Sequence, residues 1–175
     1  MRTLAVLFIC LLLVVPAIAQ SQKREPLTEA QQDQIAEAGN EPVIRVNLYV
    51  KFLNEKSDTI KGLTHRAKSA ARAKRLDGEL LDFAALLDEF SDNLDLFAQR
   101  KADIRKSFKG MNEGIERWKT MLRDLPSEPG FELSLKDADA SLADLADQTK
   151  QISEDQDAYF KAHPDEKDQD RWEPK

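Results

Sequence analysis

The sequence contains little cysteine, histidine or glycine, and each shortage argues against a class of function. Its single cysteine, Cys10, lies near the N-terminus, so the rest of the chain can form neither a disulfide nor a thiolate site. His65 and His163 are far apart in sequence and neither follows an E-x-x-H pattern, which argues against a ferritin-like di-metal centre. Six glycines in 175 residues provide no G-x-S-x-G elbow and no glycine-rich phosphate loop. We therefore expect a protein that is not an enzyme and needs no cofactor or metal.

Long apolar runs are also missing, except at the N-terminus. There, residues 4–15 follow Arg2 and precede an A-x-A pattern that ends at Ala19. A basic start, a short apolar core and small residues before a cleavage point are typical of a secretory signal peptide, and the core is too short for a comfortable transmembrane helix. We predict that residues 1–19 are removed near Ala19 and that the mature protein is secreted or periplasmic. No later stretch is apolar enough to span a membrane.

The charge balance is acidic. The whole chain has a net charge of −6. After removal of Arg2 with the signal peptide, 25 Lys and Arg face 32 Asp and Glu, a net of −7. This balance argues against a nucleic-acid partner, because nucleic-acid binders are usually basic. A chain of this length is expected to form one domain.

The two ends of the mature chain are polar. Residues 20–41 contain few large apolar side chains, and Thr28 followed by Gln31 matches a capping box, which predicts a short helix that ends near Gly39. Residues 162–175 are highly charged, with Trp172 as their only large apolar side chain, and are predicted to be disordered. The segment between these ends, residues 42–161, is predicted to be a single helical domain.

A long heptad pattern organises that domain. Every seventh residue from Leu76 to Leu125 is apolar, and a companion series from Leu80 to Leu122 is interrupted only by Lys101. Such spacing places the apolar side chains on one helix face, which must be buried against partner helices. Because residues 97–104 contain neither glycine nor proline, the pattern favours one continuous helix over about 77–125. The alternative is a break near Lys101, which would give a compact four-helix bundle.

Two further helices are predicted to pack against this central helix. Residues 43–74 continue the 3,4 spacing after Pro42, and residues 134–161 resume it after Pro126 and Pro129 have ended the central helix. The fold class is therefore all-α, an elongated antiparallel helical bundle. A monomer is favoured because the partners lie in the same chain, and a homodimer is the alternative.

Blocks of like charge support antiparallel hairpins. Residues 61–75 hold six Lys and Arg and no acid, whereas residues 76–99 hold seven acids and no base. Downstream, residues 100–123 have eight bases against three acids, and residues 134–157 have seven acids against two lysines. We expect the opposite blocks to face each other across the two hairpins, which would disfavour swapped arrangements.

One set of basic residues is a candidate binding surface. Lys61, His65, Lys68, Arg72 and Arg75 recur at 4,3,4,3 spacing and would form one stripe. The stripe could bind an anionic surface or an acidic envelope protein, or it could simply pair with the acidic block of the neighbouring helix. For Lys101, we favour a side chain that extends into solvent over a buried specificity device or a functional amine.

The segment Leu27-Thr28-Glu29-Ala30-Gln31 reads L-T-x-x-Q and resembles the motif of periplasmic helical chaperones and stress sensors of the LTxxQ kind. That resemblance implies a holdase-type chaperone or stress sensor. The residues themselves favour a non-enzymatic envelope protein with a binding or structural role and an unidentified partner. A holdase would require an exposed apolar concavity.

Overall fold

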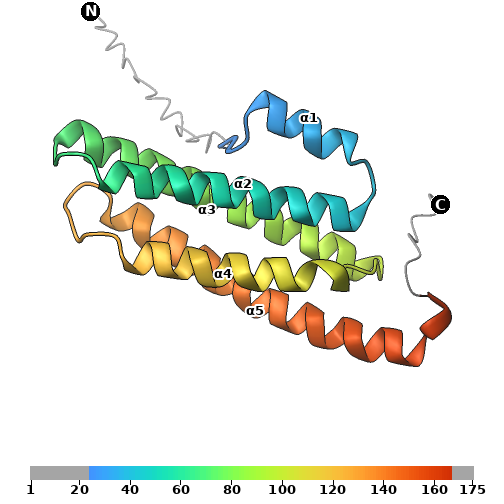
Figure 1. The fold of residues 1–175 in the computed structure, drawn as a ribbon. Coiled ribbons are helices and arrows are strands. Elements are labelled where there is room, and N and C mark those ends of the chain that lie inside the picture. The colour runs from blue at the N-terminus through green and yellow to red at the C-terminus, as the bar shows by residue number, and fades with distance from the viewer. Residues whose placement is uncertain (1–23, 167–175) are drawn as a thin grey trace, which may run out of the picture.

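The computed structural model describes residues 24–166, which form five α-helices and no strand (Figure 1). The helices are α1 (Glu29–Glu37), α2 (Pro42–Thr64), α3 (Ala70–Gln99), α4 (Phe108–Arg123) and α5 (Glu132–Ala162). Two single-turn 3-10 helices, η1 (Arg105–Ser107) and η2 (Pro164–Glu166), complete the secondary structure of this range. The predicted all-α helical bundle is confirmed. The predicted signal peptide and residues 167–175 of the predicted disordered tail lie outside the described residues.

The four long helices form a square bundle made of two antiparallel hairpins. One hairpin is α2 and α3, the other is α4 and α5, and they stack so that α2 lies beside α4 and α3 lies beside α5 (Figure 1). The neighbours that run in the same direction are therefore α2 with α4 and α3 with α5. Because α3 and α4 occupy diagonal corners, the chain crosses the end of the bundle between them.

The heptad pattern fills the interior of this square. All fifteen of its positions are buried except Lys101, which is exposed, and Leu125, which is partly buried. Large rings join the helices across the core: Tyr49 stacks on Phe90 with ring centroids 5.2 Å apart, and Phe83 meets Trp118 edge-on at 6.2 Å. The prediction that this stripe is the core is confirmed.

The preferred prediction of one continuous helix over 77–125 is wrong, and the alternative break near Lys101 is confirmed. Lys101 adopts a left-handed conformation, with φ of 57°. Its N–H donates to the Ala98 carbonyl (3.1 Å) and the Ala102 N–H donates to the Phe97 carbonyl (3.0 Å), the two bonds of a Schellman motif that ends α3. The buried Gln156 of α5 then holds the connection, because its amide donates to the Ala102 carbonyl (2.7 Å) and accepts from the N–H of residue 104 (3.1 Å).

The predicted helix over 43–74 is also wrong, because it is two helices. The chain turns at residues 65–69, where Ser69 caps α3 by accepting a hydrogen bond from the Arg72 N–H (3.1 Å). The Arg72 guanidinium reaches back to the carbonyls of Thr64 and Arg66, both at 3.4 Å, and so satisfies groups that the end of α2 leaves free. The boundary expected between 74 and 77 lies inside α3, since Asp77 and Gly78 are both helical.

The remaining predicted helices agree with the structure. The last helix, predicted over 134–161, is α5, and the short N-terminal helix is α1, which begins with the predicted Thr28 capping box. Of the predicted tail, residues 164–166 form η2. No helix within residues 24–166 combines the length and apolarity needed to cross a membrane.

Candidate functional site

Residues 24–38, here called the strap, lie along the outer side of α2 (Figure 1). Three apolar side chains anchor the strap, Leu27, Ile35 and Ala38, each exposed by 9 % or less. The strap belongs there because eight of the eleven residues in 43–53 of α2 are apolar. A helix that is apolar nearly all round needs cover on more than its core-facing side.

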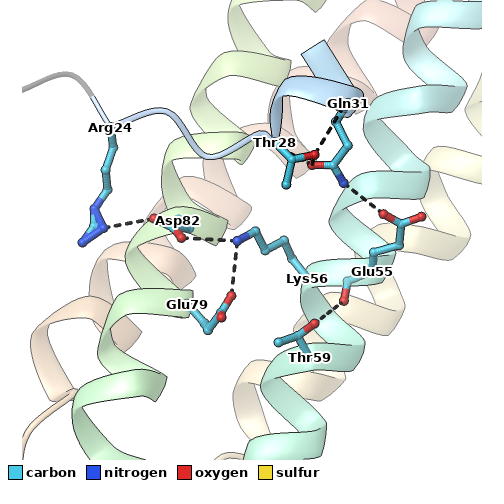
Figure 2. A network of polar contacts seen from close by, with 8 residues as sticks. All are labelled: Arg24, Thr28, Gln31, Glu55, Lys56, Thr59, Glu79 and Asp82. Atoms are coloured by element: carbon cyan, nitrogen blue, oxygen red, sulfur yellow. Dashed lines mark hydrogen bonds and ion pairs between the residues drawn. The ribbon is translucent and has the colours of Figure 1, made fainter. Parts of the chain in front are cut away.

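An ionic network fixes the N-terminal end of the strap (Figure 2). Arg24 Nη1 lies 3.0 Å from Asp82 Oδ1, and Lys56 Nζ lies 3.2 Å from both Asp82 Oδ2 and Glu79 Oε2. Two cations thus balance two carboxylates. The side chains of Lys56 and Glu79 are about one-fifth exposed, whereas that of Arg24 is 45 % exposed, so solvent and salt weaken the strap's own contribution.

The L-T-x-x-Q residues form the first turn of α1 and contact α2 (Figure 2). The Gln31 N–H donates to Thr28 Oγ1 (3.3 Å), and the Thr28 N–H donates to Gln31 Oε1 (3.0 Å), which completes the capping box. The same Gln31 side chain donates from Nε2 to Glu55 Oε2 of α2 (3.0 Å). Together with the buried Leu27, this segment is a helix start that docks on the bundle.

A hydrogen-bonded network ties the other end of the strap to α2 and α3. Tyr49 donates to Glu89 (2.8 Å) and accepts from the Asn93 amide (3.0 Å), while Arg45 donates to Asn93 (3.0 Å) and to the carbonyls of residues 35 and 39. Burial, and next the hydrogen bond to Glu89, raise the pKa of the Tyr49 hydroxyl well above its ordinary value. Tyr49 is therefore a neutral donor that holds the site together, and it is unsuited to act as a base.

A cleft of about 410 Å³ lies between the strap and α3. Its lining mixes apolar and polar side chains: Arg24, Glu25, Pro26, Leu27 and Gln32 from the strap, and Glu89, Asp92 and Asn93 from α3. In the part of the chain that the structure describes, no group of three histidine, cysteine or carboxylate side chains is arranged to hold a metal ion. The cleft is an open groove of mixed polarity beside the strap.

The topology separates charge onto two faces of the bundle. The basic face, defined as α2 and α4, carries eight Lys and Arg against four Asp and Glu, whereas the acidic face, defined as α3 and α5, carries fifteen acids against six bases. On the acidic face, Gln148 of α5 bonds to Ser91 Oγ (2.9 Å) and to Asp95 Oδ1 (2.7 Å) of α3, so the two rows of carboxylates run side by side. The net charges of the two helix pairs are +4 and −9. Because the strap over α2 adds one base and four acids, a net of −3, the strong charge of the molecule lies on the acidic face.

The predicted pairing of charge blocks holds only in part. The α3 acids Glu79 and Asp82 do pair with α2, but through Lys56, which lies outside the predicted block at 61–75. The reason is the turn at 65–69, which places most of that block in the turn or on α3 itself. Lys68 and Arg72 from this block contact Glu128 of the α4–α5 connection.

The structure places the five residues of the predicted basic stripe in different surroundings. Lys61 is half-buried at the end of α2, His65 and Lys68 are exposed in the turn, and Arg75 is exposed on α3. Arg72 is buried and pairs with Glu128, and the hydrogen bond from its guanidinium is the main reason that the pKa of the Glu128 carboxyl is lowered. Arg72 therefore joins two loops of the bundle. Binding of an anionic partner by the other four residues stays a prediction.

Lys101 and His163 both lie near the Tyr159 ring, at the opposite end of the bundle. Lys101 is exposed, as predicted, and its Nζ lies 5.4 Å from the centroid of the Tyr159 ring, which stacks on His163 at 4.4 Å. A cavity of only about 50 Å³ separates Lys101 from α5. This volume suits ordered water rather than a substrate.

Two features of the site were missed by sequence reasoning. The strap's docking surface had a signal, since residues 43–53 are too apolar for a helix with one buried face. The separation of charge had no signal in the sequence, because it depends on which helices become neighbours in the square bundle.

Comparison of the chain with protein-family models, with curated proteins and with solved structures finds no match. The function must therefore be inferred from the strap and the two charged faces.

Proposed function

We propose that this chain is a non-enzymatic, secreted or periplasmic binding module that docks a basic component of the cell envelope on its acidic face. The observation that supports this proposal is the separation of charge between the two helix pairs. Residues Asp88, Asp92 and Asp95 on α3 and the carboxylates of α5 are exposed, with few bases among them. Such a surface attracts a cationic partner over several ångströms and repels other acidic surfaces.

The apolar side chains support a charged rather than an apolar docking surface. The apolar side chains of the heptad pattern are buried inside the monomer, except for the partly buried Leu125. Within residues 24–166, the large apolar side chains that stay exposed are Ile44, Leu96 and Leu133, on three different helices. A holdase of the LTxxQ kind would need a contiguous apolar patch. We therefore propose the binding module with an acidic docking face as the first function and the holdase as the second candidate.

The proposal is tested by affinity capture from a native envelope fraction, with residues 20–175 as bait. A variant in which Asp88, Asp92, Asp144 and Asp147 are changed to Asn should lose the captured protein. That protein should be basic, and raised salt should weaken its capture by wild type. The matched control changes Glu113 and Glu116, both exposed on α4, to Gln and should capture as wild type does.

The opposite pattern would refute the proposal. If capture survives neutralisation of the acidic face but is lost when Lys61, Lys68 and Arg75 are changed to Glu, the basic residues make the contact. The partner is then an anionic surface or an acidic protein. Far-UV circular dichroism of each variant shows whether the bundle is intact.

A further inference from the structure

The outer side of α2 is an apolar helix face that the strap covers. Lys51 donates to Gln34 (3.3 Å) and Glu55 accepts from Gln31 (3.0 Å), and these two contacts mark the side of α2 that faces the strap. Leu48 and Phe52 lie on this same side, at the spacing of helical neighbours. Phe52 is 1 % exposed and Leu48 is partly buried, both packed with the core cluster that includes Leu27 and Ile35 of the strap.

The strap is held far less firmly than the four long helices. Its helix, α1, has nine residues and buries only Ile35 among them, and a helix of this length is not stable by itself in water. Its side-chain hydrogen bonds to Lys51 and Glu55 are made at the exposed surface, and Arg24 is nearly half exposed. Segments with few buried contacts and exposed hydrogen bonds are the first to open in a folded protein.

When the strap opens, Arg45 loses its hydrogen bond to the carbonyl of residue 35 but keeps the one to Asn93, so the contacts between α2 and α3 remain. Gly39 follows the strap with φ of +55°, a conformation that glycine adopts freely, so the chain can pivot there. When Arg24 moves away, Asp82 keeps its contact with Lys56, and no buried carboxylate loses its last partner. The four long helices contact one another directly.

We propose that the strap is a releasable cover over a helix-binding surface on α2. When the strap opens, this surface takes an amphipathic helix from a partner protein. The strap itself shows how such a helix fits: Ile35 inside α1 is buried, and Leu27 and Ala38 are buried just beyond its two ends. This is binding of a helix in an apolar groove, with the protein's own segment as the resident competitor. The inference does not rest on the acidic face.

The test uses residues 20–175 and a fluorescently labelled peptide of residues 24–41 as the probe. Changing Leu27 and Ile35 together to Asp should release the strap, and fluorescence anisotropy should then show peptide binding at least about tenfold tighter than to wild type. The reason is that the intact strap competes at a high effective concentration. Hydrogen exchange should show fast amides over residues 29–37 and unchanged protection in α2 to α5. Changing Asp33, exposed on α1, to Ala is the matched control and should alter neither readout.

A milder variant covers the case in which the double change unfolds the protein. Arg24→Glu places a carboxylate against Asp82, and should raise both strap exchange and peptide affinity while the helical content stays constant. Released strap amides together with an unchanged peptide affinity would overturn the proposal. Equal binding of a scrambled peptide of the same composition would overturn it too, as would full strap protection in both variants.

Discussion

Replacement of Gln156 by Ala should strongly destabilise the bundle. The side chain is buried on α5, and its amide makes two hydrogen bonds to the backbone of the α3–α4 connection, at 2.7 Å and 3.1 Å. Truncation leaves one buried carbonyl and one buried N–H without a partner, and each such group costs about 1–3 kcal/mol. We therefore expect a loss of about 2–4 kcal/mol in the free energy of unfolding, allowing for partial relaxation of the loop.

Urea unfolding followed by circular dichroism at 222 nm measures this loss, and the midpoint of thermal unfolding should fall by about 6–12 °C. Gln156→Leu separates the two effects of the change, because it keeps the volume but removes both hydrogen bonds. It should be nearly as unstable as the Ala variant. Gln151→Ala, which removes an exposed amide bonded to Asp155, is the control and should cost less than about 0.5 kcal/mol. A Leu variant as stable as wild type, or an Ala variant that loses less than about 1 kcal/mol, would refute the reasoning.

Three further predictions, made with four substitutions, test other parts of the structure. Lys101→Gly should stabilise the protein by about 0.5–1 kcal/mol in urea unfolding, since glycine adopts the left-handed conformation at this helix end without the penalty that lysine incurs. Gly114→Ala should lower the free energy of unfolding by about 1–3 kcal/mol, because the new Cβ would lie 2.9 Å from a carbon of the buried Trp118 indole. Gly110→Ala places its Cβ in open space and should raise the free energy of unfolding by about 0.5–1 kcal/mol. Equal effects of the two substitutions would contradict this packing. The ion pair with Arg72 lowers the pKa of the Glu128 carboxyl below its ordinary 4.5. The pair therefore stabilises the folded state fully above pH 4.5, and this stabilisation is lost as the pH falls through the lowered pKa. The free energy of unfolding, measured from neutral pH downward, should therefore fall less steeply with acid in Glu128→Gln than in wild type. Identical curves for the two proteins would show that the pair of Glu128 with Arg72 does not stabilise the fold.

The heptad pattern predicted which residues are buried better than it predicted where helices end. Phe97 and Ile104 are both buried at the expected spacing, yet the chain between them leaves the helix and returns. Periodicity reports that side chains face the core, and a short non-helical segment can keep the same spacing. The only local signal for the break is the interruption of the apolar series at Lys101. The polar groups that the break frees are bonded by Gln156, more than fifty residues away, so the sequence near Lys101 could not decide between the two predictions.

The turn at 65–69 was missed for a related reason. Its residues tolerate a helix, and the signals that end α2 and start α3 are a serine cap and the arginine that reaches back to two carbonyls. The Thr28 capping box, in contrast, was predictable because both of its partners lie within four residues. For the candidate site, the basic stripe assumed one continuous helix, and the true turn leaves Arg72 buried while the other four residues are spread around it.

The diagonal crossing between α3 and α4 also bears on how the chain assembles. Each hairpin consists of neighbouring segments and can form through local contacts, which close quickly. The pairing of α3 with α5 and of α2 with α4 can form only when the finished hairpins meet, so their docking should be the slow step of folding. A protein cut once within residues 100–104 would then consist of two hairpin fragments, and their reassociation into the native bundle should depend on concentration.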